Sequence, residues 1–111
     1  MRFCLAKDIR PVAFSPVARP SPVDKKLQND AYIQELAAKY NKSAVQIMLN
    51  WGLCKGHVVI PKATGLDHQL ENLAIFDFKL TEDEILGVEK LNKGIRLCNK
   101  FGAMEGFDVF A

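Results

Sequence analysis

The residues with the clearest capacity for chemistry follow two short apolar runs. Ser15 comes directly after VAF, and Lys62 comes one proline after HVVI. Residues Thr64 to Asp67 then open a predicted short helix, and the free N–H groups at a helix start attract anions. Sites in parallel α/β folds form at the carboxyl ends of strands. A hydroxyl, a cation and a helix start at that edge predict a phosphate site; the alternative is that Lys62 is a solvated surface charge.

Two predicted strands must position these residues. Val12 to Phe14 form a short buried strand, which the pair Ser15-Pro16 closes because proline cannot donate to a strand ladder. The β-branched run at 57–60 lacks alternation, so it predicts a strand covered on both faces. Residues 18–27 contain two prolines and no periodicity, which predicts a loop.

Two helices are predicted between these strands. The first begins at Asn29 or Asp30 and has one apolar face, formed by Ile33, Leu36, Ala37 and Tyr40. The second begins with a capping box of Ser43 and Gln46 and ends at Lys55-Gly56.

Two further helices are predicted after the second strand. A short one covers TGLDHQLENLAIF, with Thr64 as its cap. The other opens with a capping box of Thr81 and Glu84 and turns four apolar residues inward: Ile85, Leu86, Val88 and Leu91. Residues 95–111 lack helical spacing and are expected to lie extended against another surface.

The order of these elements predicts a parallel sheet with right-handed crossovers, an α/β fold. Two strands are too few to cover both faces and both edges of such a sheet. We therefore expect the 111 residues to form a single partial domain, with elements over 1–94 and a tail over 95–111.

Composition narrows the classes of protein. The 15 Lys and Arg are interleaved with 13 Asp and Glu, and a net charge of +2 does not indicate a nucleic-acid protein. Neither a signal peptide nor a membrane span is apparent. Cys4, Cys54 and Cys98 form no CxxC, which favours free thiols in a reducing compartment, and we expect a cytoplasmic protein.

Several motifs in this order resemble the C-terminal third of an aldo-keto reductase. They are VAFSPVARP, LAAKYNKSAVQIMLNW, VVIPKATGLDHQLENLAIFDFKLTEDEI and LNKGIR, and the resemblance runs from about Ile9 to Arg96. It implies an α/β fold that is the C-terminal portion of a (β/α)8 TIM barrel: the last two strands with their helices and the C-terminal tail. MRFCLAKDI resembles the last turns of the helix before the seventh strand.

The resemblance implies an NADP(H) site at the ends of the two strands. Phe14 matches the aromatic residue that stacks on the nicotinamide, and Ser15 and Val17 match the turn beneath the pyrophosphate. The family usually has leucine where Val17 stands.

The second strand end implies the adenosine half of the same site. Lys62 matches the lysine that pairs with the 2′-phosphate, beside Thr64 at the helix start. Glu71 and Asn72 match the pair that contacts adenine.

Two departures from the family pattern weaken the expected grip on the 2′-phosphate. Ala63 replaces the usual serine and removes a hydroxyl donor. His68 replaces an arginine, and a neutral imidazole cannot give the bidentate contact of a guanidinium. The preference between NADPH and NADH is therefore open.

The resemblance implies no catalytic residue in this chain. The family's Asp, Tyr, Lys and His set lies on earlier strands, which would precede Met1. Tyr32 and Tyr40 lie on a helix remote from the strand ends and are interpreted as packing residues, and His57 precedes its strand.

Two functions remain open. The chain is either the cofactor-binding part of a carbonyl-reducing oxidoreductase, inactive alone, or a shortened non-catalytic paralogue. The paralogue would use open strand edges and the aromatic tail to self-associate or bind a partner.

Overall fold

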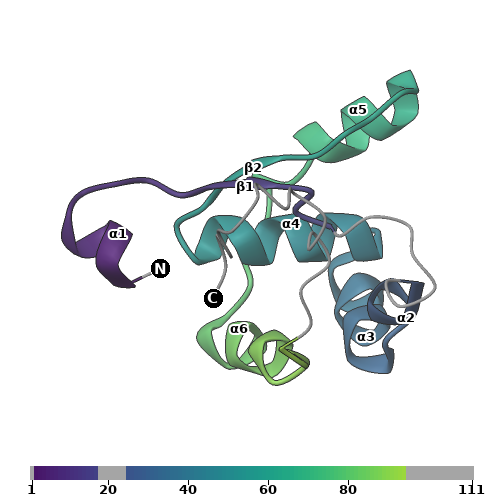
Figure 1. The fold of residues 1–111 in the computed structure, drawn as a ribbon. Helices are drawn as coiled ribbons and strands as arrows, with labels where there is room; N and C mark the ends of the chain where they lie inside the picture. The colour runs from purple at the N-terminus through teal and green to yellow at the C-terminus, as the bar shows by residue number, and fades with distance from the viewer. Residues whose placement is uncertain (1, 18–24, 95–111) are drawn as a thin grey trace, which may run out of the picture.

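Two short parallel strands and the helices around them form the fold. The computed structural model describes residues 2–17 and 25–94. The predicted tail over 95–111, with Cys98, and most of the loop predicted over 18–27 lie outside these residues. In chain order the described elements are α1 (Arg2–Ala6), β1 (Val12–Phe14), α2 (Lys25–Gln28), α3 (Ala31–Tyr40), α4 (Ala44–Cys54), β2 (Val58–Ile60), α5 (Leu66–Leu73) and α6 (Glu82–Glu89) (Figure 1).

The strands β1 and β2 pair in parallel, as predicted. Val12 lies opposite Val58, and Phe14 lies opposite Ile60. The helix α4 runs along one face of this pair, where Gly52 of α4 approaches Val59 closely (Figure 1). The carboxyl ends of β1 at Phe14 and of β2 at Ile60 therefore lie side by side, and Ser15 follows β1 at this end of the sheet.

The other face of the sheet is open, so the prediction of a strand covered on both faces is wrong for the described part of the chain. Its four side chains are 46–55% exposed, and we call them the open sheet face: Val12, Phe14, Val58 and Ile60. The reason is that α4 packs on the opposite side of the sheet, where Gly52 approaches Val59 of β2.

The core lies between α3, α4 and α6. Asp30 caps α3 by accepting a hydrogen bond from the Tyr32 N–H, and Ser43 and Gln46 form the predicted capping box of α4. The predicted inward residues Ile33, Leu36 and Ala37 are buried there, with Ile47 and Leu80. Both tyrosines of α3 pack against this core, as predicted.

Side-chain amides of α4 fix the segment that connects α5 to α6. Asn50 Nδ2 donates to the carbonyls of Ile75 and Phe78, both at 2.9 Å, and Asn50 Oδ1 accepts from Leu80 N–H. Gln46 Nε2 donates to the carbonyls of Glu71 and Ala74. Because these carbonyls find side-chain donors, α5 ends at Leu73, short of the predicted extension to Phe76.

The helix α6 has its predicted capping box of Thr81 and Glu84, but its inward face differs from the prediction. Ile85, Val88 and Leu91 pack against the core, whereas Leu86 is 52% exposed. Leu86 lies one residue beyond Ile85, a turn of about 100° around the helix, which takes it off the face that 85 and 88 share.

Two local predictions fail at helix starts. The single turn α2, Lys25–Gln28, begins inside the loop predicted over 18–27 and ends one residue beyond it; one turn is too short to show a period in the sequence. Thr64 is not the cap of α5; Gly65 takes that position and makes no side-chain hydrogen bond.

At the N-terminus, the expected helical residues form α1, which lies away from the body of the fold (Figure 1). Cys4 and Cys54 are free thiols, as predicted. Among the described residues, the helices are too short or too polar to traverse a bilayer.

Candidate functional site

The two predicted site loops leave the sheet at the same edge. The parallel register pairs Phe14 with Ile60, so the turn that starts at Ser15 and the loop that holds Lys62 both begin at the carboxyl ends of adjacent strands. This is the edge at which parallel α/β folds place ligands.

The turn after β1 has an unusual backbone. Ser15 has φ 49°, a left-handed conformation that costs a residue other than glycine about 1 kcal/mol. Ser15 and Val17 are half-buried, and Phe14 is 54% exposed on the open sheet face. The turn therefore presents an aromatic ring and a hydroxyl next to each other at the strand end.

The loop after β2 holds the site's cation. Lys62 is exposed, and no carboxylate among the described residues lies within ion-pair distance of its ammonium group. Ala63 is half-buried and Thr64 is exposed. The ammonium is thus available to a ligand anion.

The first turn of α5 adds backbone donors. Gly65 has no side chain to accept from these N–H groups, so the cap position leaves them open to a ligand. Asp67 lies in the same turn and offsets part of the positive helix end. The start of α5 can therefore assist Lys62 in holding an anion.

His68 and Glu71 form a pair on the exposed surface of α5. His68 Nδ1 lies 3.2 Å from Glu71 Oε2, and the two side chains are 73% and 48% exposed. Imidazole and carboxylate are three residues apart, the spacing at which helix side chains meet. The pair orients His68 but leaves most of its ring in solvent.

Two of the predicted residues line a common hollow. Ala63 and Asn72 border a cavity of about 620 Å³, together with apolar side chains that include Leu53, Val59 and Leu73. The other predicted residues border neither this cavity nor the larger one described next. The hollow therefore joins Ala63 of the loop after β2 to the later part of α5, and Lys62 lies outside its lining.

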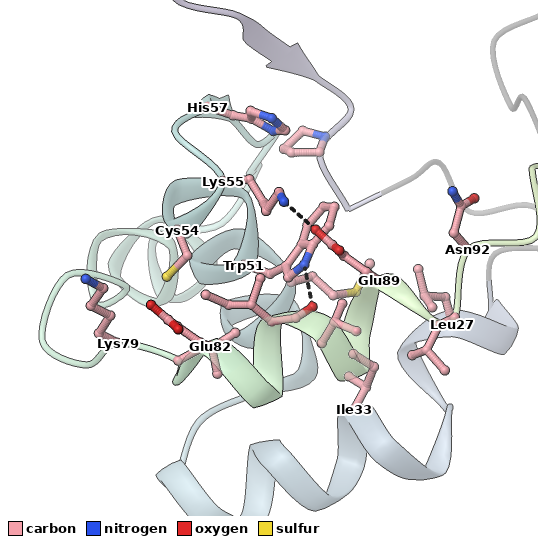
Figure 2. Close-up of a pocket in the computed structure, with 16 residues that line it drawn as sticks. Leu27, Ile33, Trp51, Cys54, Lys55, His57, Lys79, Glu82, Glu89 and Asn92 are labelled. Atoms are coloured by element: carbon pink, nitrogen blue, oxygen red, sulfur yellow. Dashed lines mark hydrogen bonds and ion pairs between the residues drawn. The ribbon is translucent and has the colours of Figure 1, made fainter. Parts of the chain in front are cut away.

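A second hollow, of about 1010 Å³, lies mainly between α4 and α6 and contains none of the nine predicted site residues. Figure 2 shows Lys55 paired with Glu89 across it, and the Trp51 Nε1–H donates to the Ile85 carbonyl at 3.3 Å. His57 borders both hollows. Trp51 of α4 and its C-cap residue Lys55 are four residues apart, so the sequence indicates only that they share one face of the helix and not that a hollow lies there.

His57 has a buried polar atom in this region. Its Nε2 has no hydrogen-bond partner among the described residues. Burial, and then the positive charge of Lys55, lower the pKa of His57 below its ordinary 6.5. The ring is therefore neutral at pH 7. His57 stands at the amino end of β2, away from the carboxyl ends of the strands.

Comparisons with known proteins identify the family. The profile of the Aldo/keto reductase family matches residues 1–93. Aldo-keto reductase family 1 member D1 of Mus musculus is 41% identical over 102 residues, which are 86% of this chain and 31% of that protein. The uncharacterized oxidoreductase YtbE of Bacillus subtilis (strain 168) is 34% identical over 97 residues, 87% of this chain and 33% of that protein.

Solved structures show the same relation. An aldo/keto reductase from Brucella melitensis matches with a TM-score of 0.71 and 34% identity, covering 82% of this chain and 33% of that one. MGS-M4, an aldo-keto reductase enzyme from a Medee basin deep-sea metagenome library, matches with a TM-score of 0.81 and 26% identity, covering 96% of this chain and 38% of that one. The α/β arrangement described above therefore matches part of aldo-keto reductase barrels.

The chain spans about a third of the length of these curated relatives. Its predicted resemblance is confirmed by the family profile and by both solved structures. The chain belongs to the aldo-keto reductase family.

Proposed function

We propose that this chain is the cofactor-binding part of an NADP(H)-dependent aldo-keto reductase, with β1 and β2 as the last two strands of a (β/α)8 barrel. The observation that carries the proposal is the position of Lys62, exposed beside the uncapped start of α5, at the sheet edge where the Phe14-Ser15 turn also ends. The family uses NAD(P)H.

The proposed nicotinamide half lies at the end of β1. The exposed ring of Phe14 would stack on the nicotinamide, and the Ser15 to Val17 turn would support the pyrophosphate. The left-handed conformation of Ser15 supports this role, because strained backbone persists where surrounding structure fixes it and is frequent at ligand sites.

The proposed adenosine half lies at the end of β2 and the start of α5. Lys62 and the N–H groups near Thr64 would hold the 2′-phosphate, and Glu71 and Asn72 would contact the adenine. The cavity that Ala63 and Asn72 border has a volume and an apolar lining suited to part of such a ligand.

This site would grip the 2′-phosphate weakly. Ala63 supplies no hydroxyl, and His68 stands largely in solvent beside Glu71. Bound NADPH supplies the hydride for reduction of an aldehyde or ketone; this chain would hold and orient the cofactor, and we place the catalytic acid outside these 111 residues. We also propose a cytoplasmic location and a single partial domain over 1–111.

Replacement of the lysine tests the proposal. Lys62→Met should weaken NADPH binding about tenfold, because it removes a charge-assisted contact to the phosphate. NADH lacks that phosphate, so its affinity should change little. Fluorescence titration of both cofactors measures this, and Lys90→Met, at the exposed lysine that follows α6, is the matched control. Equal losses for NADPH and NADH would contradict a phosphate contact at Lys62.

One observation favours a second function, that of a non-catalytic binding protein. The open sheet face and the exposed leucines of α5 are apolar surfaces of the kind that bind other proteins. Sedimentation of the purified chain separates the two functions. A defined oligomer favours the binding protein, whereas a monomer that forms only when the cofactor is added favours the reductase part.

A further inference from the structure

We propose that His57 is an acid-sensitive latch at the joint between α4 and β2, residues 55–57. Its neutral ring keeps this joint closed, and a proton on the ring opens it. The latch lies at the amino end of β2, whereas the proposed cofactor site lies beyond the carboxyl ends of the strands. Three features support it: the backbone turn that places the ring, the side chain against which the ring packs, and the charges around it.

A Schellman motif ends α4 and fixes the backbone of His57. Lys55 is the C-cap, and Gly56 follows with φ 77°, a left-handed conformation that glycine adopts without strain. The Gly56 N–H donates to the Leu53 carbonyl at 2.9 Å, and the His57 N–H donates to the Gly52 carbonyl at 3.0 Å. These two hydrogen bonds turn the chain from α4 directly into β2, so the joint determines where β2 begins.

The ring of His57 occupies the position at which a Schellman motif often packs an apolar side chain back on the helix. It contacts Trp51, with the two rings perpendicular and their centroids 6.4 Å apart. Trp51 is held in turn by its Nε1–H, which donates to the Ile85 carbonyl of α6 at 3.3 Å. A neutral imidazole therefore stands where an apolar residue is usual, in a contact that links α4, α6 and the start of β2.

The buried edge of this ring is unsuited to a positive charge. His57 Nε2 is buried and has no hydrogen-bond partner in the part of the chain that the structure describes. A proton at Nε2 would therefore make a buried cationic donor without an acceptor, which costs more than a buried neutral nitrogen. Opening of the joint would let water solvate that charge.

The charged groups around the ring do not compensate it. Lys55 adds a positive charge beside it, and the amino-terminal group acts in the same direction. Glu89 of α6 is the carboxylate on this side of the larger hollow, and it is already paired with Lys55 (Figure 2). The other charged residues that border this hollow, Lys79 and Glu82, are exposed and lie away from the ring (Figure 2). The described lining of the smaller hollow contains no charged residue.

Proton binding and opening are therefore linked, with a known sign. Burial, and then the positive charges, lower the pKa of His57 in the closed joint, whereas in an open joint the ring returns toward its ordinary 6.5. The closed joint has its full stability above pH about 6.5 and loses stability as the pH falls below that value. The Glu84 carboxylate, which is lost only below pH about 4.5, does not contribute at pH 5.

Amide hydrogen exchange of the whole chain, followed by NMR without cofactor, tests the proposal. The Gly56 and His57 amides report on opening, because both donate within the joint. After correction for the intrinsic pH dependence of exchange, we expect their opening equilibrium to rise at least about fivefold from pH 7 to pH 5. The His57 imidazole signals should titrate with a midpoint below pH 6.5.

Two variants separate His57 from other causes. His57→Phe places an apolar ring at the same position, so its opening equilibria at pH 7 and pH 5 should agree within about twofold. His68→Gln is the matched control, since the chain has two histidines and His68 is exposed on α5. This variant should keep the whole pH dependence of the unmodified chain.

Four outcomes would overturn the proposal. The first is protection of the two amides that is absent at pH 7, or that stays constant or increases toward pH 5. The second is an equal loss of protection in His57→Phe, and the third is a pH dependence that His68→Gln removes. The fourth is a His57 imidazole midpoint at or above pH 6.5. If His57→Phe does not fold, the imidazole titration and the exchange of the unmodified chain decide.

Discussion

Glu84 is the described residue whose ionisation is most strongly coupled to the fold. It is 7% exposed, and its carboxylate accepts hydrogen bonds from the Lys39 ammonium at 2.6 Å and from the Tyr40 hydroxyl at 2.7 Å. Burial by itself would raise the pKa of Glu84. The Lys39 ammonium, the Thr81 N–H and the Tyr40 hydroxyl outweigh burial and lower the pKa from 4.5 to about 2.

A lowered pKa in the folded state gives a pH dependence of known sign. The stabilisation by ionised Glu84 is present above pH about 4.5 and is lost as the pH falls toward about 2. Glu84→Gln should lower the free energy of unfolding by about 1–3 kcal/mol at pH 7 and by much less at pH 2. Urea unfolding across this pH range measures the difference.

The control for this prediction is Glu82→Gln, in the exposed first turn of the same helix. It should leave the pH dependence nearly unchanged. A stability gap between the unmodified chain and Glu84→Gln that stays constant from pH 7 to pH 2 would show that Glu84 is not held ionised by its partners.

His68 offers a prediction of gained function at the proposed phosphate site. His68→Arg should tighten NADPH binding about two- to fivefold, the gain expected of an exposed ion pair, and leave NADH binding unchanged. An arginine at this position can also keep the contact with Glu71 that His68 makes. Cofactor titration measures both affinities, and an unchanged NADPH affinity would argue against a position for residue 68 at the phosphate.

At the scale of elements, the close approach of α4 to β2 depends on a glycine. A Cβ at Gly52 would lie 2.9 Å from Val59 Cγ1. Alanine favours a helix interior over glycine by about 1 kcal/mol, but the stiff valine side chain cannot move aside easily. Gly52→Ala should therefore destabilise the fold by about 1–3 kcal/mol, the usual cost of overpacking.

A double-mutant cycle checks the cause of that destabilisation. In a Val59→Ala background the contact is gone, so Gly52→Ala should cost little or should stabilise the chain. Thermal or urea unfolding of the four variants gives the coupling. The same cost in both backgrounds would mean that the glycine is needed for a reason other than its contact with Val59.

The elements show how far local sequence patterns predict this fold. The capping boxes of α4 and α6 and both strands were predictable, because each depends on residues a few positions apart. The end of α5 was not, because Asn50 and Gln46 of α4 supply donors to distant carbonyls. Leu86 was placed inward wrongly, since tertiary packing and not composition selects which helix face is buried.

In the candidate site too, some features follow from local sequence patterns and others depend on packing between distant elements. The placement of Ser15 and Lys62 at one edge followed from two parallel strands, which the sequence pattern predicted. The cap at Gly65 and the hollow shared by Ala63 and Asn72 depend on how α5 leaves the sheet. His57 and the second hollow could not be predicted from strand ends at all, because they arise from packing between helices.

At the scale of the whole molecule, the chain combines a packed helical core with an unfinished sheet. The core around Ile33, Ile47 and Leu80 is buried, while the open sheet face and the leucines of α5 are exposed. Two paired strands alone are only marginally stable in water, so the packing of α3, α4 and α6 must supply most of the stability of the fold. The proposed cofactor site lies at the sheet and at α5, outside this helical core.

The measurement that tests the central proposal most directly is a thermal melt of the purified chain by circular dichroism, alone and with millimolar NADPH or NADH. A ligand stabilises only a state that it binds, and at 100 times its Kd it adds about 2.7 kcal/mol, or about 10 °C for a domain of this size. We predict a cooperative melt that NADPH shifts upward, with a smaller shift for NADH. A melt that neither cofactor moves would contradict a working cofactor site in this chain.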